Sequence, residues 1–161
     1  MKEVKLHKIL IFGNSGSGKS TLAKQLSGDE GIAHLDLDTL AWQPTEPPQR
    51  KSLEQSQREI DAFLGRNGGW VIEGCYADLL AFVADAADEM IFLDLPVENC
   101  IANARRRLWE PHKYPSKAAQ DANLDMLIDW IAAYSTREDE FSRTAHEALF
   151  LRFHGRKQRY P

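Results

Sequence analysis

The chain has 161 residues, of which 43% are hydrophobic and 27% are charged, a composition that excludes collagen-like, fibrous and mostly disordered proteins. Lys and Arg number 20 against 24 Asp and Glu, and the net charge of −4 disfavours a protein that binds nucleic acid or anionic lipid over its whole surface. No apolar stretch is long enough for a signal peptide or a membrane span, and Cys75 and Cys100 are isolated, so we expect a cytoplasmic protein with reduced thiols and no membrane partner.

Short apolar runs alternate with helical patterns along the chain. Strands are predicted at residues 9–12, 33–35, 70–72, 90–93 and 148–153. Helices are predicted at residues 19–26 and 51–64, after Pro96, around 124–131, and from Ser135, where a capping-box spacing occurs. Pro44, Pro47 and Pro48 interrupt regular structure after the second strand. The alternation indicates an α/β fold with a parallel sheet and helices on both faces.

The strongest motif follows the first predicted strand. Residues 13–20 read GNSGSGKS, a complete G-x-x-x-x-G-K-[ST] loop between a strand and a helix, where glycines and backbone N–H groups cradle phosphate oxygens. Lys19 is predicted to be a catalytic cation on the β- and γ-phosphates, and Ser20 to ligate Mg²⁺. The predicted cofactors are therefore ATP and Mg²⁺. The nucleotide-binding residues predicted in this segment are Gly13, Asn14, Ser15, Gly16, Ser17, Gly18, Lys19, Ser20 and Thr21.

Two carboxylates follow the second predicted strand, at the sheet edge where open α/β folds bind ligands. If residues 35–38 stay extended, Asp36 and Asp38 point to the same side, since side chains alternate along a strand. We assign Asp36 to Mg²⁺ and Asp38 to the acceptor and to catalysis. The alternative is that both acids are solvated or cap the next turn.

The ordered set of GNSGSGKS, HLDLD, WVIEGCY, IFLDLP, an arginine-rich helix and a polar insertion resembles the adenylate-kinase-related branch of small P-loop kinases. Within it, the chain is similar to FlaR-like "DNA topology modulation" proteins and to shikimate-kinase-like proteins. The resemblance covers nearly the whole chain. It implies one P-loop kinase-like domain over residues 1–161, of three layers, with a five-stranded parallel sheet in the order 2-3-1-4-5. It also implies a substrate region after the second strand and a short lid, which we place at about residues 109–121.

Four further residues are candidates for the acceptor and metal sites. Glu73 ends the third predicted strand and is expected to bind Mg²⁺ or the acceptor, although Asp94, which ends the fourth, competes for this Walker-B-like role. Trp42 is expected to form a wall of the acceptor pocket. Tyr76 is expected either to contact the substrate or to pack in the core.

Basic residues late in the chain are candidates for phosphate and base contacts. Arg105, Arg106 and Arg107 fan through about 200° of a helix, so they cannot all face one site. We assign Arg106 and Arg107 to catalysis, with a solvated basic face as the alternative. Arg156 lies in a basic tail after the last predicted strand. The resemblance puts the base-binding loop there, so Arg156 either contacts adenine or belongs to a disordered tail.

The sequence thus favours an ATP- and Mg²⁺-dependent phosphotransferase that acts on a hydroxyl or phosphate group of a small-molecule acceptor. The alternatives are a nucleotide-dependent regulatory ATPase and a DNA-topology-associated protein, neither of which has a small-molecule acceptor. No DNA-reading module is visible in the sequence, so no nucleic-acid partner is expected.

Overall fold

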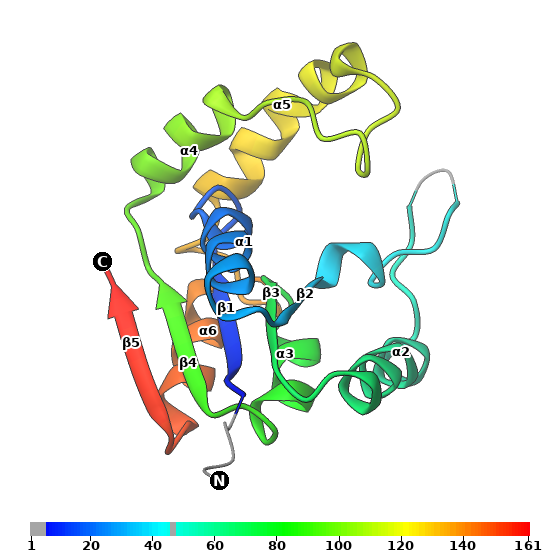
Figure 1. Cartoon of the computed structure of the whole chain (residues 1–161). Coiled ribbons are helices and arrows are strands. Elements are labelled where there is room, and N and C mark those ends of the chain that lie inside the picture. Colours follow the sequence, from blue (N-terminus) through cyan, green and yellow to red (C-terminus); the bar gives the residue numbers. More distant parts are fainter. Residues whose placement is uncertain (1–5, 46–47) are drawn as a thin grey trace, which may run out of the picture.

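The computed structural model describes residues 6–45 and 48–161. Five parallel strands form one sheet in the order β2-β3-β1-β4-β5 (Figure 1). The strands are β1 (Lys8–Gly13), β2 (Ala33–Asp36), β3 (Trp70–Gly74), β4 (Glu89–Leu93) and β5 (Arg156–Tyr160). The helices are α1 (Lys19–Glu30), η1 (Leu37–Thr39), α2 (Leu53–Arg66), α3 (Ala77–Ala84), α4 (Val97–Arg106), α5 (Lys117–Ala132) and α6 (Arg143–Arg152). This architecture confirms the predicted α/β P-loop fold and its strand order.

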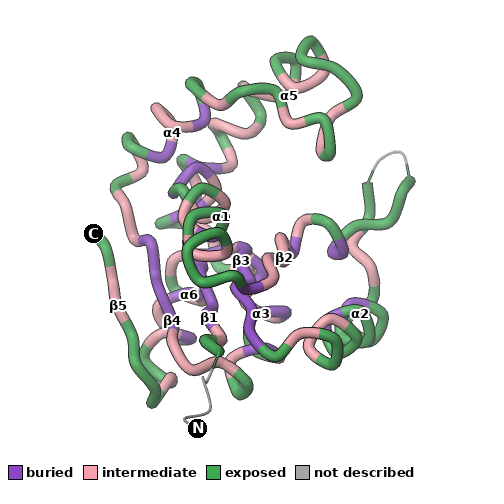
Figure 2. Tube along the Cα trace, viewed as in Figure 1, coloured by how far each residue is buried: buried purple, intermediate pink, exposed green. Residues whose placement is uncertain are grey.

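Both faces of the sheet are buried, because successive side chains of each central strand point to opposite sides. Leu10 and Phe12 of β1 pack in a large core with residues of α2, α3 and α6. Ile9 and Ile11 pack on the opposite face, against α1 around Ala23. Figure 2 shows β1 and β3 buried along most of their length, which explains why residues 9–12 are continuously apolar.

Helices α4 and α5 pack against each other and form an arm beyond the carboxyl edge of the sheet (Figure 1). Cys100 of α4 and Ile131 of α5 belong to a small core of their own. Two hydrogen bonds join the arm to the loop between β1 and α1. Asn14 Nδ2 donates to the carbonyl oxygen of Ile131 at 3.2 Å, and Asn103 Nδ2 donates to that of Gly16 at 2.8 Å. The arm is thereby fixed above the loop that carries the phosphate-binding motif.

The C-terminal strand lies later in the chain than the sequence predicts. The predicted strand at 148–153 is wrong, because these residues belong mainly to α6, which the Ser142 side chain caps by accepting from the amide of Ala145. A short apolar run fits a helix as well as a strand, and here the helix buries Leu149 against the sheet. The real strand, β5, has the polar sequence RKQRY, since it lies at the edge and pairs with β4 alone.

The helix predicted from Ser135 is also wrong. The amides of Thr136 and Arg137 both donate to the carbonyl oxygen of Ala133, so this segment completes a turn at the end of α5. Arg137 lies over the ring of Trp130, 3.4 Å from its centroid. These contacts hold the segment in a non-helical conformation that the capping-box spacing does not reveal.

Three other helices differ from the prediction. Helix α1 continues past Gly28 to Glu30 and is capped by Gly31, whose φ of +65° suits glycine. Helix α3 was not predicted. Helix α5 begins inside the predicted lid at 109–121, so the irregular part ends at residue 116, and we call residues 109–116 the lid segment.

The proline-containing loop after η1 is closed at its base by a bridge between Trp42 and Arg50. Apart from this bridge, the described residues of the loop have no helix or strand, as predicted, while Pro47 lies outside the described residues. In the part of the chain that the structure covers, every helix is too short or too polar to cross a membrane.

His146 is fully buried in α6, and its burial predicts acid sensitivity of the fold. Its ring accepts from the Tyr134 hydroxyl at Nδ1 and donates from Nε2 to the Cys75 carbonyl oxygen, each at 2.7 Å. Burial lowers the pKa of His146 from its ordinary value to about 4. Between about pH 6.5 and pH 4 the unfolded chain therefore binds a proton that the folded chain does not. We expect this residue to remove about 3 kcal/mol of stability as the pH falls through that window.

Urea unfolding between pH 7 and pH 4.5 tests this expectation. His146→Gln should flatten the loss of stability with falling pH, whereas the same change at the exposed His154 should leave the slope as in the wild type. Equal slopes in the two variants would show that His146 does not cause the acid sensitivity.

Candidate active site

The phosphate-binding motif forms a tight loop between β1 and α1. Gly16 and Gly18 have φ values of +79° and +91°, a region that residues with a side chain rarely adopt. A Cβ atom at Gly16 would also lie 2.4 Å from the carbonyl oxygen of Cys100, so α4 leaves no room for a side chain there. The glycines of the motif are thus required by this backbone path.

The loop presents a site suited to an anion. No described side chain caps α1, whose first amides have no acceptor within the helix. Lys19 Nζ donates to the carbonyl oxygen of Asn14 at 2.7 Å, which keeps the ammonium beside the loop. The Ser17 hydroxyl is buried and has no hydrogen-bond partner within the described residues. Ser15 is half-buried in the loop and Thr21 is exposed on α1. These features fit the phosphates of a nucleotide.

Glu73 lies directly beside the start of α1. It is two residues beyond Val71, which packs on the α1 face of the sheet, so both side chains point to that face. Glu73 is buried, and its Oε2 accepts from the Ser20 hydroxyl at 2.7 Å and contacts His34 Nε2 at 2.9 Å. Sequence reasoning missed His34. It lies two residues before Asp36 on β2, so the two side chains point to the same side.

The Ser20 and Glu73 pair fits an Mg²⁺ ion, which proteins usually hold through one or two oxygen ligands together with phosphates and water. No group of three Asp, Glu, His or Cys side chains within residues 6–45 and 48–161 is arranged to hold a metal.

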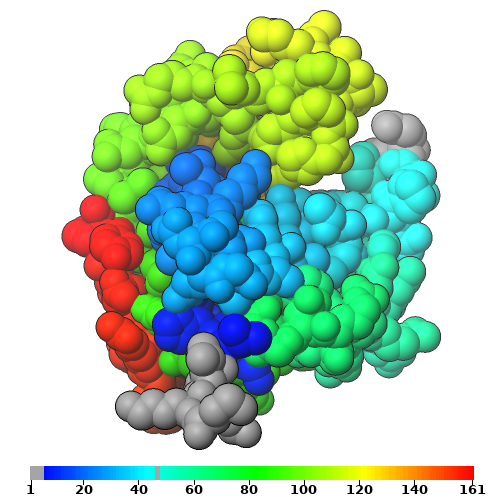
Figure 3. Space-filling model, viewed as in Figure 1, coloured from blue at the N-terminus to red at the C-terminus, as the bar shows by residue number. Residues whose placement is uncertain are grey.

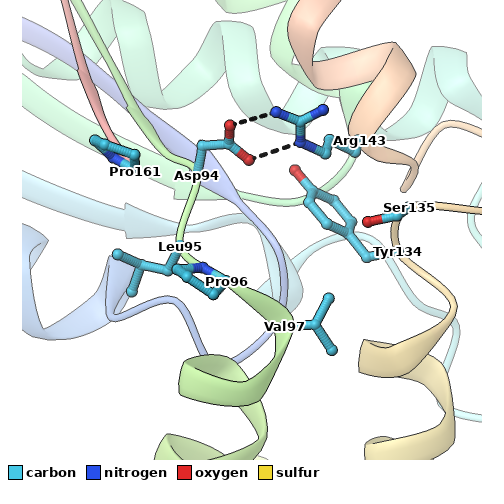
Figure 4. A pocket seen from close by; sticks show the side chains of 8 residues that line it. All are labelled: Asp94, Leu95, Pro96, Val97, Tyr134, Ser135, Arg143 and Pro161. Carbon is cyan, nitrogen blue, oxygen red and sulfur yellow. Dashed lines mark hydrogen bonds and ion pairs between the residues drawn. The ribbon is translucent and has the colours of Figure 1, made fainter.

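Asp94 occupies a different environment, at the end of β4. Both of its oxygens accept from arginines, Arg143 at 2.8–2.9 Å and Arg159 at 2.8 Å. Burial opposes ionisation, but these hydrogen bonds hold the pKa of Asp94 below its usual value. Figure 4 shows Asp94 and Arg143 facing each other. Both residues line a cavity of about 270 Å³. The Asp94 carboxylate is thus engaged by two guanidinium groups, while Glu73 contacts the phosphate loop.

The chain bends after Asp36 and does not stay extended. Residues 37–39 form η1, and Asp36 Oδ1 caps it by accepting from the amide of Asp38 at 2.9 Å. The premise that alternation along a strand aligns the two acids is therefore wrong. They converge all the same, because both carboxylates contact one ammonium group, that of Lys113.

Lys113 belongs to the lid segment, which reaches from the arm towards η1 (Figure 1). Its Nζ lies 2.8 Å from Asp38 Oδ2, 3.4 Å from Asp36 Oδ2 and 3.5 Å from Glu110 Oε2. In Figure 3 an opening separates most of the lid surface from the segment after β2. Sequence reasoning missed Lys113, since a loop lysine gives no signal that distinguishes an active-site contact from a solvated charge.

The other oxygen of Asp38 is held by an aromatic pair. Tyr76 donates its hydroxyl to Asp38 Oδ1, and Trp42 Nε1 donates to the Tyr76 oxygen at 2.7 Å. Tyr76 is buried, so it packs in the core and its hydroxyl orients Asp38. Trp42 stays partly exposed. Arg50 lies over the Tyr76 ring, 4.8 Å from its centroid.

The two acids differ in electrostatic environment. Burial and the neighbouring charges of Asp38 and Glu73 raise the pKa of Asp36. Burial also opposes ionisation of Asp38, but Lys113 and the Tyr76 hydroxyl lower its pKa overall, and Lys19 adds to that effect. Burial would lower the pKa of Lys113, but the charges of Asp38 and Asp36 raise it. Asp38 is thus ionised and Lys113 is charged at neutral pH.

The predicted arginines lie at the end of α4. Arg106 donates to Asn103 Oδ1 at 2.8 Å, and Asn103 in turn donates to Gly16, so Arg106 is linked to the phosphate loop through one side chain. Arg107 pairs with Glu110 of the lid segment at 3.4 Å. Arg105 is exposed and makes no such link within the described residues.

Arg156 does not lie in a loop after the last strand, so that part of the prediction is wrong. It is the first residue of β5, in register with Glu89 at the start of β4. The phosphate loop follows the carboxyl end of β1, and the strands are parallel, so Arg156 lies at the opposite edge of the sheet. This placement removes Arg156 from the candidate nucleotide-binding residues.

No family model matches this chain, and no curated protein matches its sequence. Among solved structures, a gluconokinase from Sinorhizobium meliloti 1021 aligns with a TM-score of 0.49 and 15% identity, covering 93% of this chain and 99% of that one. A shikimate kinase from Acinetobacter baumannii, solved in complex with shikimate, aligns with a TM-score of 0.47 and 18% identity, covering 91% of this chain and 92% of that one. At these values the likeness concerns only the course of the chain and assigns no substrate.

Proposed function

We propose that this protein is an ATP- and Mg²⁺-dependent phosphotransferase that transfers a phosphoryl group to a hydroxyl or phosphate of a small molecule. The observation that carries the proposal is the meeting of three elements at one sheet edge. The phosphate loop with Lys19, the Ser20 and Glu73 pair, and the ionised Asp38 carboxylate all follow the carboxyl ends of β1, β2 and β3.

In this proposal the loop amides and Lys19 bind and orient the nucleotide phosphates. Bound Mg²⁺ would neutralise phosphate charge, with Ser20 and Glu73 as the residues that would hold it, directly or through water. The proposal of Asp36 as a further metal residue rests on its place beside Glu73 in the β2–β3 register. Arg106, linked to the loop through Asn103, and Arg107, at the lid, are the proposed sources of additional positive charge.

Asp38 is proposed to receive the acceptor. An ionised carboxylate fixed by Tyr76 accepts a hydrogen bond from an acceptor hydroxyl and takes up its proton as transfer proceeds. Trp42 would form the exposed wall beside it. Since phosphoryl transfer asks mainly for positioning and charge stabilisation, these residues are sufficient for such a reaction.

An acceptor screen tests the proposal. The purified chain with Mg·ATP should release ADP faster with one class of acceptor among nucleoside monophosphates, shikimate, gluconate and related polyols, and mass spectrometry should find the phosphorylated product. ADP release that no acceptor accelerates would favour a nucleotide-dependent ATPase instead. Tight, salt-dependent binding to DNA would favour the DNA-topology alternative.

A further inference from the structure

We propose that Lys113 is a latch that closes the lid segment onto Asp38 in the free protein, and that the acceptor competes with its ammonium group for this carboxylate. The latch rests on the proposed function only for the role of Asp38. The contact itself can be tested without nucleotide or acceptor.

Each oxygen of Asp38 accepts one hydrogen bond in this structure. Oδ1 receives the hydroxyl of Tyr76, which is 2% exposed and cannot be replaced by a ligand without unpacking the core. Oδ2 receives the ammonium of Lys113, at 2.8 Å. The Asp38 side chain is 37% exposed, so an acceptor hydroxyl can approach Oδ2, where it competes with the ammonium of Lys113. Lys113 can leave, because it lies on a long flexible stem in a segment without helix or strand.

The remaining polar contacts of the lid segment stay within the arm. Trp109 Nε1 donates to the Tyr114 carbonyl oxygen, the Glu110 amide donates to Gln120 on α5, and Asn123 of α5 donates to the Tyr114 hydroxyl. Among residues 6–45 and 48–161, the hydrogen bonds and ion pairs that join the lid segment to β2 and η1 all come from Lys113. One side chain thus fastens the lid to the acceptor side.

The charges around Lys113 explain why the latch closes. Its ammonium meets three carboxylates, those of Asp36, Asp38 and Glu110, and is 22% exposed. The Asp38 side chain is 37% exposed, so solvent still screens part of this attraction, and the contact is a charge-assisted hydrogen bond at the edge of the site. Without Lys113, the carboxylates of the lid segment and of β2–η1 would repel each other across the opening.

Hydrogen exchange of the free protein tests the latch. We expect Lys113→Met to speed exchange of the lid-segment amides, including those of Lys113 and Tyr114 that donate to Glu110, by roughly tenfold, since the turn is too short to persist alone. Asp38→Asn should have a similar effect, and the double variant should be no faster than either single one. Lys117→Met removes an exposed lysine at the start of α5 and serves as the matched control, with wild-type exchange in the lid segment.

Wild-type exchange rates in Lys113→Met, or effects that multiply in the double variant, would overturn the latch. With an identified acceptor, Lys113→Met should also lower the acceptor KM several-fold and leave the KM for ATP unchanged. A raised acceptor KM would show that Lys113 helps to bind the acceptor and does not compete with it. If the wild type phosphorylates no acceptor, the proposed function fails while the exchange result still decides the latch.

Discussion

Lys19→Met is expected to lower kcat/KM for phosphoryl transfer by roughly 10³-fold, equivalent to about 4 kcal/mol of transition-state stabilisation. The substitution removes the ammonium that lies beside the phosphate loop and keeps a stem of similar length. Within the described residues Lys19 donates only to a loop carbonyl, so the fold should persist. Steady-state kinetics with the identified acceptor, together with calorimetric titration of Mg·ATP, measure the loss.

The matched control is Lys24→Met, which makes the same change on the exposed side of the same helix. This variant should retain wild-type kinetics, and thermal unfolding of both variants should resemble that of the wild type. If Lys19→Met keeps wild-type nucleotide affinity and activity, residues 13–20 do not form a functional phosphate loop.

Asp38→Asn is expected to lower the rate of phosphoryl transfer by roughly 10²-fold while Mg·ATP affinity stays nearly unchanged. Asparagine keeps the shape of the side chain but cannot accept a proton from the acceptor. It also loses the charge that holds Lys113, so the lid segment opens without a gain in activity. Single-turnover rates with saturating acceptor separate the lost proton acceptor from any change in acceptor binding.

Asp36→Asn is the informative comparison, because Asp36 and Asp38 contact the same ammonium. Its amide oxygen can still cap η1, so the local structure should remain. If Asp36 serves Mg²⁺, this variant should need more metal for half-maximal rate, whereas Asp38→Asn should not. Identical metal titrations of the two variants would contradict the division of roles and leave Glu73 as the stronger metal candidate.

The central strands and the phosphate loop could be read from the sequence because local rules fix them. Residues 9–12 are buried on both faces of the sheet, so all four are apolar. The glycines that follow are required by the backbone conformation of the loop. The alternation of strands and helices then restricts the topology to a parallel sheet, which is what the chain forms.

The helix and the strand at the C-terminal end could not be predicted in this way. Ala148 to Phe153 form an apolar run that suits a helix or a strand, and only packing of Leu149 and Phe150 against the sheet selects the helix. The strand RKQRY lacks an apolar signal, because its ladder to β4 supplies the backbone hydrogen bonds and its side chains lie at an exposed edge. Because Arg156 begins this strand, it lies at the edge of the sheet opposite the phosphate loop.

The sequence by itself determined the candidate residues: a glycine-rich loop with Lys19 and Ser20, and acids at the ends of the next strands. Tertiary structure alone decided which groups meet. It places Glu73 of β3 against Ser20 of α1 and pairs Asp94 with arginines. It also brings Lys113 of the lid segment into contact with Asp38, 75 residues away in the chain. The physical reason is that local spacing fixes backbone conformation and side-chain direction within an element. Contacts between carboxylates, hydroxyls and ammonium groups depend instead on how separate elements pack, which no short sequence pattern contains.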